Sequence, residues 1–222
     1  MPTSVVHAAV GFLLAIGLLG KYYDRRALFV VLGIVLFPEL DAALGLVMDG
    51  AHRTVFHTMV PSLVGGGLLY WDTTRTDSWL RGHWGEYGVR IAWVGLFVHT
   101  FAHLGFDWAH LSGINVLWPF VDQFVTLDGE VYISSTEGIV QTFVDISSDP
   151  DTGRRQIDAG QGGTTRDIHV STPVQPSKEP VTGPVDRRFP IAVGGWQLYL
   201  IGTGAFALLA RTFQTNRYEE DE

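Results

Sequence analysis

The sequence predicts an all-α membrane protein, a polytopic helical bundle of about five transmembrane segments with an inserted polar outer loop. Four stretches are apolar enough to cross a bilayer and a fifth is ambiguous, only 17% of the 222 residues are charged, and residues 127–188 are rich in Gly, Ser, Thr, Asp and Pro. A soluble domain carries about 25% charged residues, so this composition favours lipid surroundings. We therefore divide the chain into a membrane bundle (1–126), an extracytoplasmic insertion (127–188), and a last membrane helix with an acidic cytoplasmic tail (189–222).

The hydropathy pattern locates the spans, because a membrane-crossing helix needs about 20 residues at ~1.5 Å rise each. Ser4–Gly20 contains His7 but no charged residue, and it lacks the basic start and small-residue cleavage site of a signal peptide, so we expect a retained helix. Ala27–Met48 is interrupted at Pro38, which indicates either one disturbed helix or a half-helix leading into a polar re-entrant segment. The other expected spans are 54–71, 87–106 and 189–210.

The basic residues predict the orientation. Eight Lys or Arg residues fall on one side of a five-span arrangement, against Arg53 alone in the short loop opposite. The eight are Lys21, Arg25, Arg26, Arg75, Arg81, Arg90, Arg211 and Arg217. The positive-inside rule then places the amino terminus and the insertion outside the cell membrane and the carboxyl terminus in the cytoplasm.

The insertion contains two fragments that alternate between apolar and polar residues, Glu130–Ser134 and Gly138–Val144. This alternation predicts a small β-hairpin. The remainder, from Ser147 to Arg188, has the composition of an extended or disordered outer loop, and a tolerated surface loop is the simplest explanation of it.

Composition excludes several classes of site. The chain has no cysteine, which excludes disulfides, thiolate zinc sites, iron–sulfur clusters and thiol nucleophiles. Its net charge of −8 argues against nucleic acid as a partner. Any bound metal must therefore be held by His, Asp, Glu or backbone oxygen.

Ionisable side chains from distant parts of the sequence gather at one predicted depth on the outer side of the bundle. Each costs about 2.5–3.5 kcal/mol at the centre of a membrane helix on insertion scales, and a shared cation would compensate all of them. Nitrogen and carboxylate ligands suit a divalent metal: zinc is our first expectation, manganese and iron are the alternatives, and two ions fit the ligand count. The residues are His7, Glu39, Asp41, His52, His57, His103 and Asp107.

Local spacing supports this grouping, although simpler explanations stay open for each residue. His103 and Asp107 are four residues apart and share a helix face, but such a pair also forms on helix surfaces without a metal. His7 fits an interfacial histidine and His52 a helix cap. His99, one turn before His103, is more typical of a core or cavity histidine than of a ligand.

The order of these motifs resembles the YdjM-like family of membrane-bound metal-dependent hydrolases, some of which are regulated by LexA. The family's run is Leu-Pro-Asp-x-Asp, His-Arg-Gly-x-Thr-His-Ser, His-x-x-x-Asp and a Pro-Phe pair. The chain has Phe37-Pro38-Glu39-Leu40-Asp41, His52-Arg53-x-x-x-His57-Thr58, His103-x-x-x-Asp107 and Leu117-Trp118-Pro119-Phe120. It departs from the family at Glu39, Thr54 and Phe56, and residues 127–188 have no counterpart that we can place.

The resemblance implies metal-assisted hydrolysis, in which the ion acidifies water and polarises the bond under attack. The implied metal ligands are His7, Asp41, His57, His103 and Asp107, with His52 next. Glu39 is implied as a further ligand or the general base, and Arg53 as a group that neutralises charge on a phosphoester or, more simply, contacts a lipid headgroup.

The depth of the site favours a lipid or lipid-linked phosphoester as substrate, and membrane lipid is the expected partner. Two other classes of protein stay open: a metal-binding membrane transporter component and a non-catalytic membrane scaffold. Broken spans such as Ala27–Met48 occur in transporters, but the sequence shows no evident inverted repeat.

Overall fold

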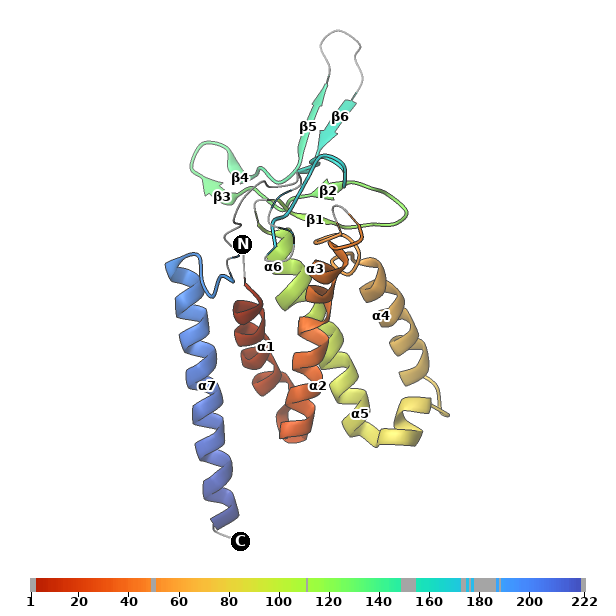
Figure 1. Ribbon diagram of the computed structural model, residues 1–222, viewed down its shortest axis with the longest axis vertical. Helices are drawn as coiled ribbons and strands as arrows, with labels where there is room; N and C mark the ends of the chain where they lie inside the picture. Colours follow the sequence, from red (N-terminus) through yellow and green to blue (C-terminus); the bar gives the residue numbers. More distant parts are fainter. Residues whose placement is uncertain are drawn as a thin grey trace.

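The computed structural model is mostly helical, with short strand pairs at one end of the bundle (Figure 1). The helices are α1 (Ser4–Leu19), α2 (Arg25–Leu36), α3 (Asp41–Leu44), α4 (Val60–Thr73), α5 (Trp79–Val98), α6 (Gly105–Trp108) and α7 (Gly195–Glu220). Two short 3₁₀ segments, η1 (Gly20–Tyr22) and η2 (Phe37–Leu40), and a π-helix, η3 (His99–Leu104), extend them. The structure describes residues 3–48, 51–110, 112–148, 155–172, 175, 177, 187 and 189–220.

Three helical stretches within the described residues are long and apolar enough to cross a membrane: Ser4–Tyr22, Arg25–Leu44 and Trp79–Trp108. The predicted bundle is thus confirmed as membrane-type and helical, with three of the five spans supported. The helix expected from residue 54 begins instead at Val60, because residues 51–59 form turns and Pro61 occupies the first turn of α4.

The interruption at Pro38 takes the first of the two predicted forms, a single disturbed helix. α2 ends at Leu36, η2 continues the rod as a tighter 3₁₀ turn, and α3 follows at Asp41. Proline has no N–H to donate to the carbonyl four residues earlier, which explains why regular α-helix stops there. The rod therefore carries Asp41 to the end of the bundle where the strands lie (Figure 1).

The core lies between α1, α2 and α5. It is built from small and branched apolar residues such as Val10, Val31 and Val98, and partly buried residues of α7 pack against it. A helix cap sets the turn between α1 and α2: Asp24 accepts a hydrogen bond from the Ala27 amide at 2.7 Å, and this bond lowers the pKa of Asp24.

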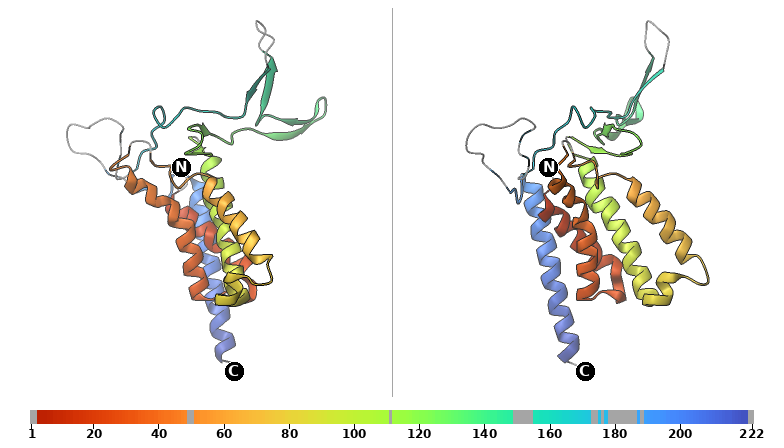
Figure 2. Two further views of the ribbon diagram at one scale, coloured as in Figure 1. Left: turned by 90° about the vertical axis from the view of Figure 1, so that its right-hand side faces the viewer. Right: turned by 45° about the vertical axis from the view of Figure 1, so that its right-hand side comes forward.

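The strands form three antiparallel pairs. They are β1 (Ile114–Asn115) with β2 (Phe124–Val125), β3 (Val131–Ser134) with β4 (Gly138–Gln141), and β5 (Asp145–Ser148) with β6 (Arg155–Asp158). The predicted hairpin is confirmed as β3–β4, with Val131 opposite Gln141. Figure 2 shows these strands projecting beyond the helices, and much of the insertion from 149 to 188 lies outside the described residues.

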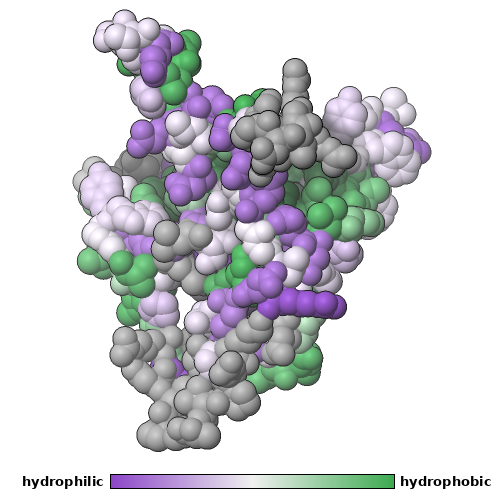
Figure 3. Space-filling view, turned by 90° about the horizontal axis from the view of Figure 1, so that it is seen from above, coloured by the Kyte–Doolittle hydropathy of each residue, from purple (hydrophilic) through white to green (hydrophobic). Residues whose placement is uncertain are grey.

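The end of the bundle that carries the strands has a polar surface. In the view onto this end, hydrophilic side chains gather across the middle and hydrophobic ones lie at the edges (Figure 3). The opposite end holds the last turns of α7 and the α1–α2 and α4–α5 connections (Figure 1). The bundle therefore presents a polar cap at the strand-bearing end.

Close packing between α7 and α1 gives a test of the fold. A Cβ atom added at Gly204 would lie 2.8 Å from the Ala9 carbonyl oxygen, whereas one at Gly202 would meet nothing within 4 Å. We expect Gly204→Ala to destabilise the protein by about 1–3 kcal/mol through overpacking. Gly202→Ala is the control on the same helix and should be neutral or slightly stabilising, since alanine is the better helix former. Thermal unfolding in detergent measures both, and equal midpoints would contradict this packing.

Candidate metal centre

His7, near the start of α1, presents one ring nitrogen to the site. Its Nδ1 lies 2.9 Å from the Ala102 carbonyl oxygen, which can only accept, so Nδ1 carries the proton. Nε2 is then left as a lone pair in a fully buried position, without a hydrogen-bond partner among the described residues. A metal-ligating histidine is typically held in this way, with one nitrogen donating to an oxygen and the other facing the ion.

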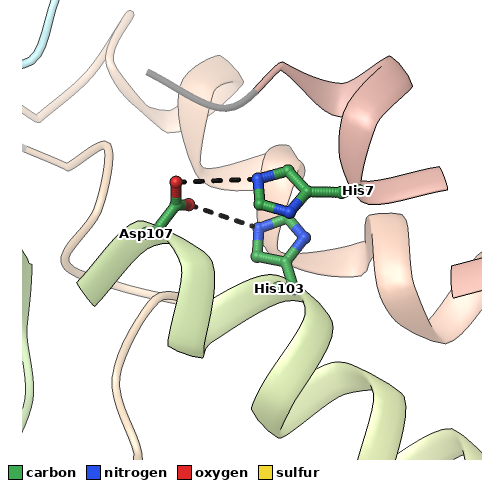
Figure 4. A group of neighbouring side chains, drawn as sticks. All are labelled: His7, His103 and Asp107. Carbon is green, nitrogen blue, oxygen red and sulfur yellow. Dashed lines mark ion pairs between the residues drawn. The ribbon is translucent and has the colours of Figure 1, made fainter. Parts of the chain in front are cut away.

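His103 and Asp107 come from the π-helix η3 and from α6, at the end of the α5 rod. π-Helical turns are rare and occur frequently at functional sites. The His103 ring stacks on the His7 ring with centroids 4.0 Å apart. Both histidines direct Nε2 toward the Asp107 carboxylate, at 3.6 Å from Oδ1 for His7 and 3.7 Å from Oδ2 for His103 (Figure 4).

His57, from the turns that precede α4, brings the third histidine nitrogen. Its Nε2 lies 2.9 Å from Nε2 of His103 and 3.2 Å from Oδ2 of Asp107. Its Nδ1 donates to Oδ2 of Asp41 at 2.7 Å. Two imidazole nitrogens that face each other at 2.9 Å repel unless a proton or a cation lies between them.

The electrostatics of His57 show how strongly this place attracts positive charge. Burial acts to lower the pKa of His57, but its hydrogen bonds to Asp107 and Asp41 and the charge of both carboxylates raise it to about 9. The protein alone therefore favours a proton on His57, and a divalent cation would satisfy the same demand.

His7, His103 and Asp107 form a group whose ligand atoms all lie within 4.8 Å of one another, so it could hold a metal ion, and Nε2 of His57 lies against two of its members. Ligand atoms around zinc lie ~3.3 Å apart when the metal bonds are ~2.0–2.1 Å. Four contacts among these donors are 2.9 to 3.7 Å long: His57 Nε2 to His103 Nε2, His57 Nε2 and His103 Nε2 to Oδ2 of Asp107, and His7 Nε2 to Oδ1 of Asp107. His103 lacks one usual feature, because its buried Nδ1 has no hydrogen-bond partner in the described part of the chain.

Asp41 and His52, also expected to bind metal, lie behind His57. Both oxygens of Asp41 accept hydrogen bonds: Oδ1 from Nδ1 of His52 at 2.7 Å, and Oδ2 from His57 and from the Arg53 amide at 3.1 Å. Asp41, His52 and His57 nonetheless form a second group whose ligand atoms lie within 4.8 Å of one another. Asp41 thus either orients His57 or, by exchanging these bonds, serves a second ion.

Arg53 connects the two groups and is itself buried, at 1% exposure. Its guanidinium donates from Nη2 to Oδ1 of Asp107 at 2.7 Å and from Nη1 to the Gly113 carbonyl at 3.2 Å. Its φ of 63° is a left-handed conformation that costs a non-glycine residue of order 1–3 kcal/mol. This backbone conformation lets the amide reach Asp41 while the side chain reaches Asp107.

Glu39 is half-buried on η2 and is not a member of either group within the described residues.

Sequence reasoning missed two residues that hold the site together. The Gly113 carbonyl accepts from Arg53, and the amide of the buried Asn115 donates to the Arg53 carbonyl at 3.1 Å. A lone glycine and a lone asparagine in a polar loop give no pattern from which such contacts can be predicted.

Hydrogen bonds join the insertion to the segment next to the site. Asp122 accepts hydrogen bonds from the Thr165 hydroxyl at 2.7 Å and from the Asn115 amide group at 2.7 Å. Burial acts to raise the pKa of Asp122, but these donors lower it overall. Part of the insertion is therefore bonded to the segment that covers Arg53.

Comparisons with known proteins agree with the membrane character of the chain. The profile of a family described as YdjM inner membrane protein matches residues 1–157, which include both groups of His and Asp and the first part of the predicted insertion. Inner membrane protein YbcI of Escherichia coli (strain K12) is 30% identical over 132 residues, which make up 55% of this chain and 70% of that relative. No solved structure matches the chain.

The arrangement predicts unequal effects of substitutions on metal binding. Asp107→Asn and His57→Ala should abolish metal retention, because each removes an atom that faces the others. Asp41→Asn should weaken metal affinity about 10–100-fold, as loss of an orienting partner does. Elemental analysis after dialysis against graded chelator concentrations measures both effects, with the exposed His83→Ala and Asp77→Asn as controls. If Asp41→Asn loses metal as completely as Asp107→Asn, Asp41 is itself a ligand.

Proposed function

Because this chain belongs to the YdjM family of inner membrane proteins, we propose that it is an integral membrane metal-dependent hydrolase of a lipid or lipid-linked phosphoester. One observation carries the proposal: three histidine Nε2 atoms and the Asp107 carboxylate converge in a buried place near one end of a membrane bundle. In this proposal α4 and α7 complete five spans, and the site end faces outward, as the basic residues indicate.

The ligands in this proposal are His7, His57, His103 and Asp107, and zinc suits the four-atom donor set. A divalent ion held there supplies Lewis-acid polarisation of a phosphoryl oxygen and acidifies water. Asp41 keeps His57 in the tautomer that leaves Nε2 unprotonated, and His52 holds Asp41 from the other side.

Two residues outside the ligand set complete the proposal. Glu39, a half-buried residue two positions before Asp41, is proposed as the carboxylate that accepts the proton of the attacking water. The guanidinium of Arg53 is already bonded to Asp107 and to Gly113, so we assign it to hold Asp107 in place and to balance its charge.

The position of the site favours a hydrolase over a transporter. A transporter needs polar groups along a route through the bundle. Among the described residues, both metal-type groups lie together near the strand-bearing end (Figure 1). A substrate whose phosphate lies at the level of lipid headgroups can reach this end from the membrane.

Metal-dependent release of phosphate tests the function. Detergent-purified protein is mixed with micelles of phosphatidic acid, phosphatidylglycerol or a polyprenyl phosphate, and phosphorus NMR follows cleavage. We expect cleavage of at least one lipid that stops on chelation, returns with zinc, manganese or iron, and falls to background in Asp107→Asn.

The variant His83→Ala, which changes an exposed histidine away from both groups, should keep full activity. A protein that retains stoichiometric metal yet cleaves none of these lipids would contradict the hydrolase proposal. Metal-dependent ion flux in vesicles would then favour the transporter class.

A further inference from the structure

Part of the insertion adds a third strand to the β1–β2 pair at the end of the bundle. The Phe124 amide donates to the Gly163 carbonyl at 2.9 Å, and the Phe124 carbonyl accepts from the Gly162 amide at 2.8 Å. Val125 forms an antiparallel bridge with Gln161. The match to the family profile ends at residue 157, so this added strand lies outside the part of the chain that the family shares.

A glycine allows the added strand to approach β2 closely. Gly160 has a φ of 75°, and a Cβ atom there would lie 2.3 Å from the Thr126 carbonyl oxygen. The Thr126 amide donates to the Gly160 carbonyl at 2.9 Å. A residue with a side chain at position 160 would therefore push this strand away from β2.

The side chain of Asp122 fastens the turn that follows the added strand. Its Oδ2 accepts from the Thr165 hydroxyl at 2.7 Å, and its Oδ1 accepts from the Thr165 amide at 3.1 Å and from the Asn115 side-chain amide at 2.7 Å. Hydrogen bonds to a carboxylate are stronger than those between neutral groups. Asp122 is exposed and Asn115 is buried, so this carboxylate joins the surface of the insertion to the interior.

Asn115 connects these contacts to the metal centre. Its backbone amide donates to the Arg53 carbonyl at 3.1 Å, and Nη2 of Arg53 donates to Oδ1 of Asp107 at 2.7 Å. The left-handed conformation of Arg53 needs such support, because a strained residue persists only where its surroundings hold it. Nε of this buried guanidinium has no hydrogen-bond partner among the described residues, so the direction of the group depends on its Nη bonds and on the segment that covers it.

We propose that Asp122 and Thr165 are positioning residues of the metal centre, which act on Asp107 while the insertion is docked on β2. Their hydrogen bonds fix Asn115, and Asn115 fixes Arg53, so that the carboxylate is held in the geometry that binds a divalent ion. Coupling between two sites is reciprocal, so a bound ion stabilises the docked insertion by the same factor. The proposal rests on the metal centre of the proposed function and does not depend on the reaction catalysed there.

The zinc affinity of the full chain in detergent, measured against graded chelator concentrations, tests these hydrogen bonds. Asp122→Ala removes all the bonds to this carboxylate and should lower the affinity about ten-fold. Thr165→Val removes only the hydroxyl and should lower it about three-fold, whereas Thr165→Ser keeps the hydroxyl and should match wild type. The control is Thr142→Val, which removes a hydroxyl that accepts from the Glu130 amide at 2.8 Å beside the β3–β4 hairpin and should change nothing.

A matched pair of glycines tests the docking of the strand. Gly160→Ala should lower the zinc affinity about ten-fold, because the added Cβ displaces the strand and leaves Asp122 and Thr165 themselves unchanged. Gly138→Ala carries the same strain, since Gly138 has a φ of 77°, but its Cβ would meet nothing within 4 Å. Its zinc affinity should equal that of wild type. Thermal midpoints of the metal-free proteins show whether each variant folds.

Hydrogen exchange gives a readout that a merely structural loop would not move. Saturating zinc should slow amide exchange in a peptide covering residues 155–168 of the wild-type protein about ten-fold. In Asp122→Ala this effect of zinc should disappear. Exchange in the β3–β4 hairpin should not respond to zinc in either protein.

The outcomes separate this proposal from the hydrolase. Equal zinc affinity in wild type, Asp122→Ala and Gly160→Ala would overturn it, as would exchange of residues 155–168 that ignores zinc. An equal loss of affinity in Thr165→Ser and Thr165→Val would also overturn it, because the hydroxyl would then have no part in the effect. A wild-type protein that retains no metal would remove the metal centre and this proposal together. The expected changes in a protein that cleaves no lipid would keep this proposal and remove only the hydrolase.

Discussion

The structure depends on the burial of one carboxylate, Asp107, inside a membrane bundle. Its oxygens lie within 3.7 Å of nitrogens from His7, Arg53, His57 and His103, which belong to three separate parts of the chain. An unpaired charge at this depth would cost several kcal/mol, so each partner compensates a penalty that the bilayer imposes. A divalent cation also needs nitrogen and carboxylate ligands that lie close together. The residues that stabilise Asp107 in the bundle are therefore the same residues that could hold a metal ion.

Irregular backbone is concentrated around this carboxylate. The rod of α2 tightens into a 3₁₀ turn at Phe37, α5 passes into a π-helix at His99, and Arg53 adopts a left-handed conformation. Each irregularity delivers a side chain to the site: Asp41, His103 and the Arg53 guanidinium respectively. Strain of this kind persists where surrounding contacts over-determine it, and here the Asn115 amide, Asp41 and the Gly113 carbonyl all hold Arg53.

An apolar groove between α2 and the start of α4 lies next to the turns that carry His57, since it is lined by Phe56 and Pro61. The covering segment from Gly113 to Phe124 and the bonded part of the insertion lie over the site, whereas the α2–α4 groove opens to lipid. In the proposed hydrolase, a lipid substrate could reach the polar end of the bundle from within the membrane.

The sequence by itself determined the membrane-type helices, the β3–β4 hairpin, and the gathering of His and Asp side chains at one depth, because hydropathy and periodicity report burial along each segment. It could not determine which groups touch. Only the tertiary structure decided that α4 begins at Val60, that Asp41 lies behind His57, and that Arg53 holds Asp107. Those contacts involve residues in turns and one residue in the left-handed conformation. Long-range packing and hydrogen bonding set the directions of their side chains, so no periodic pattern in the sequence predicts them.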